Sequence, residues 1–141
     1  MDVVAFKSEH MLALDVQDAQ ASARQFFSPE HLADLEELDS FTVLFGGRPA
    51  MCVGWVELYP TRALVWAVLA RDAGRHMTAL TRFGRRLVDG LPYRRVDAEV
   101  DAEFGQGCRW LELLGFQRET PNPLRAYNAH GGDSYIYAKV K

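Results

Sequence analysis

Apolar positions in the first forty residues alternate between strand-like and helix-like spacing. Residues 3–6 form a short apolar run that predicts a first strand. Ser8 is a helix-capping residue, and the apolar positions after it predict a helix over residues 8–16. Ser28 followed by Pro29 is the pattern of a helix start, and leucines at positions 32, 35 and 38 give the helix that follows one apolar stripe.

The middle of the chain changes to the period of two that is typical of strands. Residues 41–45 and 48–59 flank Gly46-Gly47, a dipeptide that favours a tight hairpin turn. A second turn at Pro60-Thr61 leads into residues 63–70, which are almost continuously apolar. Such a run is typical of a strand buried on both faces, so we expect three consecutive strands in this part of the chain.

The last part of the chain mixes both periods. Apolar residues recur every three or four positions from Met77 to Leu91 and predict an amphipathic helix, which Gly90 and Pro92 end. Residues 96–100 alternate as a strand, and glycines at 105 and 107 are expected to break the chain before a short helix over 108–114. Strands are expected at 116–120 and 135–140. This order predicts one domain over residues 1–141, with an α+β fold whose mixed central sheet is flanked by helices.

Composition adds a charge asymmetry to this picture. The chain has 141 residues, 48% hydrophobic and 25% charged, which is typical of a globular domain and excludes disordered and collagen-like chains. The net charge is −3, but residues 71–95 contain seven arginines and two acids, so this window carries +5 and the rest carries −8. A local basic block in an acidic chain favours a small anionic ligand over a nucleic acid.

The sequence also bears on compartment and metal content. It has no signal-peptide pattern and no apolar stretch of bilayer length, so we expect a cytoplasmic protein without a membrane partner. Cys52 and Cys108 lack metal-type spacing and are expected to be reduced thiols. The four histidines are scattered along the chain, so no metal site is expected.

One segment resembles a known family. Residues 109–116 read Arg-Trp-Leu-Glu-Leu-Leu-Gly-Phe and end the predicted helix in a leucine-glycine-phenylalanine turn. Together with the element order, this resembles the GNAT-type N-acetyltransferases over roughly residues 3–140. Trp66, the pair Arg82 and Arg85, and Asp101-Ala102 extend the resemblance to small GNAT-like proteins of tailed phages, the family labelled internal virion protein A. The resemblance implies a GNAT-like fold and, for a phage-encoded chain, location in the host cytoplasm.

The resemblance implies an acetyl-CoA site after the strand at residues 63–70. Family members carry Gln/Arg-x-x-Gly-x-Gly/Ala there, and this chain has Arg71-Asp72-Ala73-Gly74-Arg75-His76, with a histidine where a small residue is usual. Backbone N–H groups and the dipole at a helix start favour phosphate. The expected cofactor-binding residues are Val68, Leu69, Arg71, Gly74, Arg75 and His76.

The catalytic pattern of the family is incomplete. The tyrosine that many members use to protonate the leaving thiolate corresponds to Leu111, which cannot donate a proton, and residues 63–70 lack the acid often seen there. Proton transfer then falls to acids near strand ends and to tyrosines of the last third of the chain. The expected catalytic residues are Glu57, Asp101 and Tyr127, with Glu99, Glu103, Tyr135 and Tyr137 as further candidates. Strand alternation places Tyr135 and Tyr137 on one face of the last strand.

Two functions stay open at this stage. The first is a GNAT-fold acyltransferase that transfers an acetyl group from acetyl-CoA to an amine. The alternative is a non-catalytic GNAT-fold phage protein that binds a host or virion protein. No motif indicates the acceptor or the oligomeric state.

Overall fold

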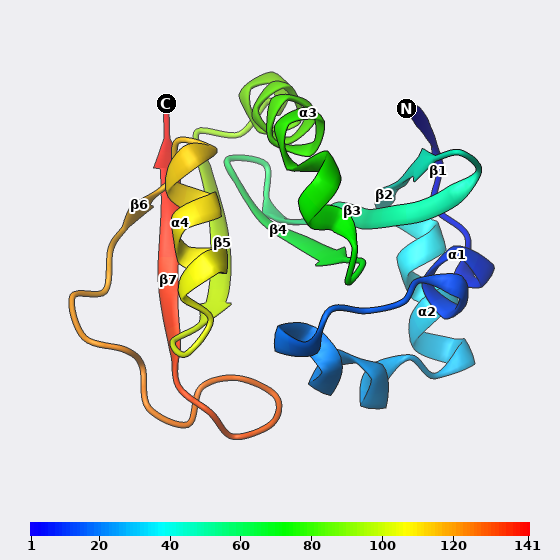
Figure 1. The fold of residues 1–141 in the computed structure, drawn as a ribbon. Coiled ribbons are helices and arrows are strands. Elements are labelled where there is room, and N and C mark those ends of the chain that lie inside the picture. Colours follow the sequence, from blue (N-terminus) through cyan, green and yellow to red (C-terminus); the bar gives the residue numbers. More distant parts are fainter. The chain divides into compact units, whose positions relative to one another are not determined.

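The computed structural model describes residues 1–141 apart from the side chain of Phe26. The chain divides into two compact units. The first unit contains Met1–Val56 and Val65–Arg75, and the second contains Glu57–Leu64 and His76–Lys141. Two strands, β3 (Arg48–Tyr59) and β4 (Arg62–Leu69), run through both units (Figure 1).

The first unit combines a β-meander with short helices. Its further elements are β1 (Asp2–Ala5), α1 (Ser8–Ala13), the 3₁₀ helix η1 (Asp18–Phe26), α2 (Pro29–Glu37) and β2 (Asp39–Phe45). β2 pairs antiparallel with both β1 and β3. The turn between β2 and β3 has Gly46 at φ 57° and Gly47 at φ 76°, values that glycine adopts without strain, so the predicted hairpin is confirmed.

The core of the first unit forms where α1 and α2 bring their apolar stripes together. As predicted, Ser28 caps α2 by accepting a hydrogen bond from the His31 backbone N–H at 3.2 Å, with Pro29 in the first turn. Trp66 contacts Phe6 edge to face, with 6.1 Å between ring centroids. The buried side chains of this core are Phe6, Met11, Leu14, Val16, Leu32, Leu35, Cys52, Val68 and Ala70.

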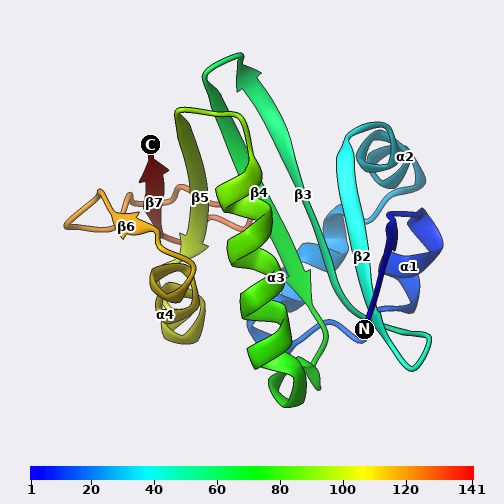
Figure 2. The ribbon, with the colours of Figure 1, turned by 90° about the horizontal axis from the view of Figure 1, so that it is seen from above.

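The second unit is built on β7 and two helices. Its elements after β4 are α3 (Met77–Gly90), β5 (Arg95–Asp101), α4 (Gly105–Leu113), β6 (Gln117–Arg118) and β7 (Ser134–Val140), with the 3₁₀ turn η2 (Ala73–His76) leading into α3. β7 lies between β5 and β6 and pairs antiparallel with both (Figure 2). Trp110 of α4 donates from Nε1 to Thr81 Oγ1 of α3 at 2.9 Å, which joins the two helices.

All seven strands belong to one mixed sheet in the order β1-β2-β3-β4-β5-β7-β6, flanked by helices. This confirms the predicted α+β architecture. Among the described residues, the helices are all too short or too polar to cross a membrane.

The predicted end of the first helix is wrong. Instead of continuing to Val16, α1 ends at Ala13, and Leu14 adopts an extended conformation with φ −69° and ψ 123°. Val16 then forms an isolated antiparallel bridge with Ala70. The apolar residues after Ala13 are therefore buried because the chain pairs with the end of β4, and not because the helix continues.

The predicted chain break at residues 105–107 is also wrong, because α4 begins at Gly105. Gly107 lies against the ring of Phe104, and a β-carbon at position 107 would come within 2.5 Å of that ring. This glycine thus admits an aromatic ring beside the first helical turn, where a larger residue would clash.

Three further strand and loop predictions need correction. β4 is only half-buried at residues 64–67, and a polar side chain of η1, that of Gln20, donates to its Ala67 carbonyl. The strand predicted for residues 116–120 is limited to Gln117–Arg118, since Thr120 contacts β7 through its side-chain hydroxyl, which accepts from the Ile136 N–H at 3.0 Å. Residues 18–26, for which no element was expected, form η1.

The close packing around Gly54 of β3 leads to a prediction about stability. A β-carbon at Gly54 would lie 2.6 Å from the Asp39 carbonyl oxygen and 2.9 Å from Cζ2 of Trp66. We expect Gly54→Ala to lower the free energy of unfolding by about 1–3 kcal/mol through overpacking, measured by urea denaturation. Gly90→Ala is the matched control, because nothing lies within 4 Å of a β-carbon there. An unchanged stability of Gly54→Ala would contradict the packing.

Candidate functional site

The predicted cofactor residues Val68 and Leu69 lie at the end of β4. Two glutamines of the same chain form hydrogen bonds with the backbone there. The Leu69 N–H donates to Gln20 Oε1 at 3.0 Å, and the Leu69 carbonyl accepts from the Gln17 N–H at 3.0 Å. Gln20 Nε2 donates to the Ala67 carbonyl at 2.8 Å. Val68 contributes its side chain to the core of the first unit. Neither glutamine was expected, because polar residues without periodicity carry no signal in the sequence.

Arg71 is paired with acids of the first unit. Its NH1 contacts Asp18 Oδ1 at 2.6 Å, its Nε lies 3.5 Å from Asp15 Oδ2, and its backbone N–H donates to the Asp15 carbonyl at 2.7 Å. The hydrogen bond to Asp18, followed by the charges of Asp18 and Asp15, raises the pKa of the Arg71 guanidinium. Arg71 therefore ties the end of β4 to Asp15 and to the first residue of η1, Asp18.

Gly74 and Arg75 present a more open surface. No atom lies within 4 Å of a β-carbon built at Gly74, and Arg75 is exposed. Within the described part of the chain, no carboxylate forms an ion pair with Arg75. His76 opens the second unit as the N-cap residue of α3, whose first turn contains no acid and receives no hydrogen bond from the His76 side chain. Five of the six predicted cofactor residues thus belong to the first unit, and His76 belongs to the second.

The three predicted catalytic residues all belong to the second unit, and each has a different partner. Glu57 accepts a hydrogen bond from the Tyr93 hydroxyl at 2.9 Å. Tyr127 lies with its hydroxyl 3.4 Å from Glu99 Oε1. The charge of Glu99, and then desolvation, raise the pKa of the Tyr127 phenol, so this hydroxyl keeps its proton.

Asp101 forms a carboxylate–imidazole pair with His130. Asp101 Oδ2 lies 3.1 Å from His130 Nε2, while Oδ1 accepts from the Glu103 backbone N–H at 2.9 Å. A β-carbon at Gly132 would come within 2.8 Å of His130 Nε2, so the glycine makes room for the imidazole. His130 lies in an irregular segment with no motif, so its role could not be predicted from the sequence. Among the described residues, no group of three or more His, Cys, Asp or Glu is placed to hold a metal.

The further tyrosine candidates are engaged in packing. Tyr137 is fully buried, and its hydroxyl donates to Glu112 Oε1 at 3.3 Å and accepts from Arg118 Nε at 3.1 Å. The Arg118 guanidinium lies 3.8 Å from the Tyr135 ring centroid and 5.5 Å from that of Tyr137, so the two tyrosines share one face of β7 as predicted.

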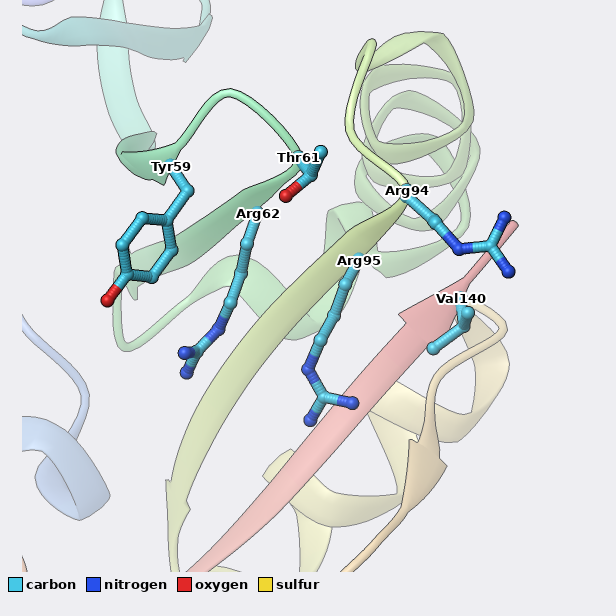
Figure 3. A pocket seen from close by; sticks show the side chains of 6 residues that line it. All are labelled: Tyr59, Thr61, Arg62, Arg94, Arg95 and Val140. Carbon is cyan, nitrogen blue, oxygen red and sulfur yellow. The ribbon is translucent and has the colours of Figure 1, made fainter.

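A separate pocket of about 310 Å³ gathers arginines of the second unit. Asp97 is 2% exposed and lies between Arg62 Nε at 2.6 Å and Arg95 Nε at 2.7 Å. Figure 3 shows Arg62 and Arg95 extending in the same direction, whereas Arg94 points away from them. The buried carboxylate neutralises part of the arginine charge, so this network fastens the starts of β4 and β5. The pocket is lined by Tyr59, Thr61, Arg62, Arg94, Arg95 and Val140.

Tyr137 gives a prediction for alkaline pH. Desolvation raises the pKa of the Tyr137 phenol to about 12, whereas an unfolded tyrosine titrates near pH 10. Above pH 10 the unfolded chain therefore binds fewer protons than the native chain, and the free energy of unfolding should fall by at most about 1.4 kcal/mol per pH unit. Tyr137→Phe should reduce this slope in urea titrations between pH 10 and 11. Tyr59→Phe, at an exposed position, should keep it, and equal slopes for both variants would refute the assignment.

The backbone of this chain is similar to those of solved acetyltransferase structures. No family model matches the chain, and no curated protein matches its sequence. Ard1 from Thermoplasma volcanium is 16% identical with a TM-score of 0.77, covering 99% of this chain and 96% of that one. A GNAT-family acetyltransferase from Bacillus anthracis is 15% identical with a TM-score of 0.68, covering 98% and 93%. A spermidine N-acetyltransferase chimera from Vibrio cholerae and hSSAT is 16% identical with a TM-score of 0.73, covering 99% and 94%.

These identities carry information on the backbone alone. They give no support to the narrower phage family, which stays a prediction from the sequence. The predicted GNAT-like fold is confirmed: the chain has the fold of GNAT-family acetyltransferases.

Proposed function

We propose that this chain is an acetyl-CoA-dependent N-acetyltransferase that acts on an amine. The observation that carries the proposal is the backbone likeness to acetyltransferases, which for the GNAT-family protein from Bacillus anthracis extends over 98% of this chain and 93% of that one. Because one fold can host unrelated activities, the proposal also needs groups suited to the cofactor and to proton transfer.

The residues after β4 suit an anionic cofactor. Gly74 leaves open space, Arg75 is an exposed cation, and α3 starts without an acid in its first turn. Unpaired N–H groups and the helix dipole at such a start favour phosphate oxygens. We assign Arg71, Gly74, Arg75 and His76 to the pyrophosphate. We assign the backbone of Val68 and Leu69 to the amide-bearing arm of acetyl-CoA, because Leu69 already binds a carboxamide, that of Gln20.

Proton transfer is assigned to groups of the second unit. When bound, acetyl-CoA would supply a thioester whose carbon–sulfur bond breaks as the carbon–nitrogen bond forms, while the amine loses one proton and the thiolate gains one. His130 is suited to accept the amine proton, because Nε2 faces Asp101 and Nδ1 is left as the acceptor. Asp101 is then a positioning residue for the imidazole. The Tyr127 hydroxyl, which lies near Glu99, is assigned to protonate the thiolate, and Glu57 is the other proton acceptor that the sequence predicted.

A second candidate function is a non-catalytic GNAT-fold protein that binds another protein, as the sequence resemblance to the phage family suggested. Two observations favour it. Leu111 is a buried leucine at the position of the family's usual tyrosine, and Gln17 and Gln20 occupy the backbone of Leu69. The binding and turnover measurements below separate the two candidates.

Cofactor binding tests the proposal through Arg75. We expect acetyl-CoA to bind the full chain in isothermal titration calorimetry, and Arg75→Glu to weaken the binding about 10- to 100-fold through loss of a charge-assisted contact. Arg109→Glu is the matched control, because Arg109 is an exposed arginine on α4 and is not assigned to the site. Absence of binding at millimolar acetyl-CoA, or equal weakening in both variants, would contradict the proposal.

Turnover tests the role of His130. With an amine panel that includes spermidine and a peptide with a free N-terminus, we expect His130→Gln to lower kcat about 100-fold and to leave acetyl-CoA affinity unchanged. The exposed His31, on α2, gives the control variant His31→Gln with unchanged kcat. If His130→Gln keeps kcat within about two-fold of the starting protein, His130 is not the proton acceptor. Cofactor binding without turnover on any amine would favour the non-catalytic candidate.

A further inference from the structure

Residues 15–20, here called the strap, run along the end of β4. Asp15, Gln17 and Gln20 of the strap form hydrogen bonds with the backbone of residues 67–71. The Arg71 N–H donates to the Asp15 carbonyl at 2.7 Å, and the Gln17 N–H donates to the Leu69 carbonyl at 3.0 Å. Gln20 bonds Ala67 and Leu69 with its side chain. The strap thereby satisfies backbone groups that a neighbouring strand would otherwise pair.

The Gln20 side chain imitates a peptide group in this pairing. Its Oε1 accepts the Leu69 N–H at 3.0 Å, and its Nε2 donates to the Ala67 carbonyl at 2.8 Å. Gln17 Nε2 donates to the same Oε1 at 2.8 Å and fixes the carboxamide plane. Any ligand that lays an amide along this edge needs the same donor and acceptor, so such a ligand and Gln20 compete for Ala67 and Leu69.

Val16 anchors the first half of the strap in the core, whereas the half that carries Gln20 is held by contacts that cost little to break. Residues 18–20 begin η1, a nine-residue 3₁₀ helix, and 3₁₀ helices longer than three or four residues are uncommon because their hydrogen-bond geometry is poor. Most η1 residues are exposed. The Arg71–Asp18 pair is also exposed, with 52% and 84% of the two side chains accessible, and exposed ion pairs add little stability.

We propose that Gln20 sets the affinity of the β4 edge for the amide-bearing arm of a CoA-type ligand by competing with that arm for Ala67 and Leu69. The inference rests on the proposed function, because it takes the ligand class from it. Movement of residues 18–20 also parts Arg71 from Asp18, which leaves Asp15 as the carboxylate beside the guanidinium. The competing side chain and one of the two acids on Arg71 are thus removed by one movement at the start of η1.

The first arm of the test uses the ligand-free full chain. Amide hydrogen exchange of Leu69, followed by NMR, should be at least about ten-fold faster in Gln20→Ala, because the N–H loses its acceptor. Gln25→Ala is the matched control, an exposed glutamine of η1. Gln20→Glu keeps an acceptor for Leu69 but loses the donor to Ala67, so its exchange should lie between the two. Unchanged exchange in Gln20→Ala would overturn the assignment of Gln20 to this edge.

The second arm measures CoA binding by calorimetry for the same variants. We expect CoA to bind Gln20→Ala about 5- to 100-fold more tightly than the starting chain, the effect of removing two competing hydrogen bonds, and to bind Gln25→Ala unchanged. Equal or weaker binding to Gln20→Ala would overturn the competition and leave the proposed function standing. Absence of CoA binding in every variant, including Gln20→Ala, would overturn the proposed function and the competition together.

Discussion

A buried backbone amide needs a hydrogen-bond partner, and at Leu69 that partner is a side chain 49 positions earlier in the sequence. Leu69 is 7% exposed. The same stretch of chain that brings Gln20 to Leu69 leaves α1 at Ala13, bridges to Ala70 through Val16, and brings Asp15 and Asp18 to Arg71. It also decides how a ligand can approach the end of β4.

The second unit meets a different constraint, the burial of charge. Asp97 is acceptable inside the protein because Arg62 and Arg95 both contact its carboxylate. On the same strand, Asp101 is less buried and holds a histidine instead. β5 thus carries two carboxylates with different roles. Asp97 is paired with two arginines and stabilises the structure, whereas Asp101 is paired with a histidine and orients its imidazole.

The sequence predicted the features that depend on local spacing. The Gly46-Gly47 hairpin, the Ser28 cap and the long helix α3 follow from turn chemistry and from apolar periods of two or of three to four. It failed where other contacts override the local pattern. Val16 has helical spacing but forms a bridge with Ala70, far along the chain, and Gly107 lies against the ring of Phe104 at the start of α4. The candidate site was the hardest part to predict, because its residues come from distant parts of the chain. The basic loop was visible as a charge block, whereas Gln20 and His130 acquire their partners only through the fold.

If an amide-bearing cofactor takes the place of Gln20 at Leu69, the exchange is visible in solution. The most direct test is a titration of ¹⁵N-labelled full chain with acetyl-CoA, following the Gln20 side-chain NH₂ signals and the Leu69 N–H by NMR. We expect the Gln20 signals to move to positions typical of a solvated carboxamide while the Leu69 N–H stays hydrogen bonded. Binding of acetyl-CoA with the Gln20 signals unmoved would contradict this exchange.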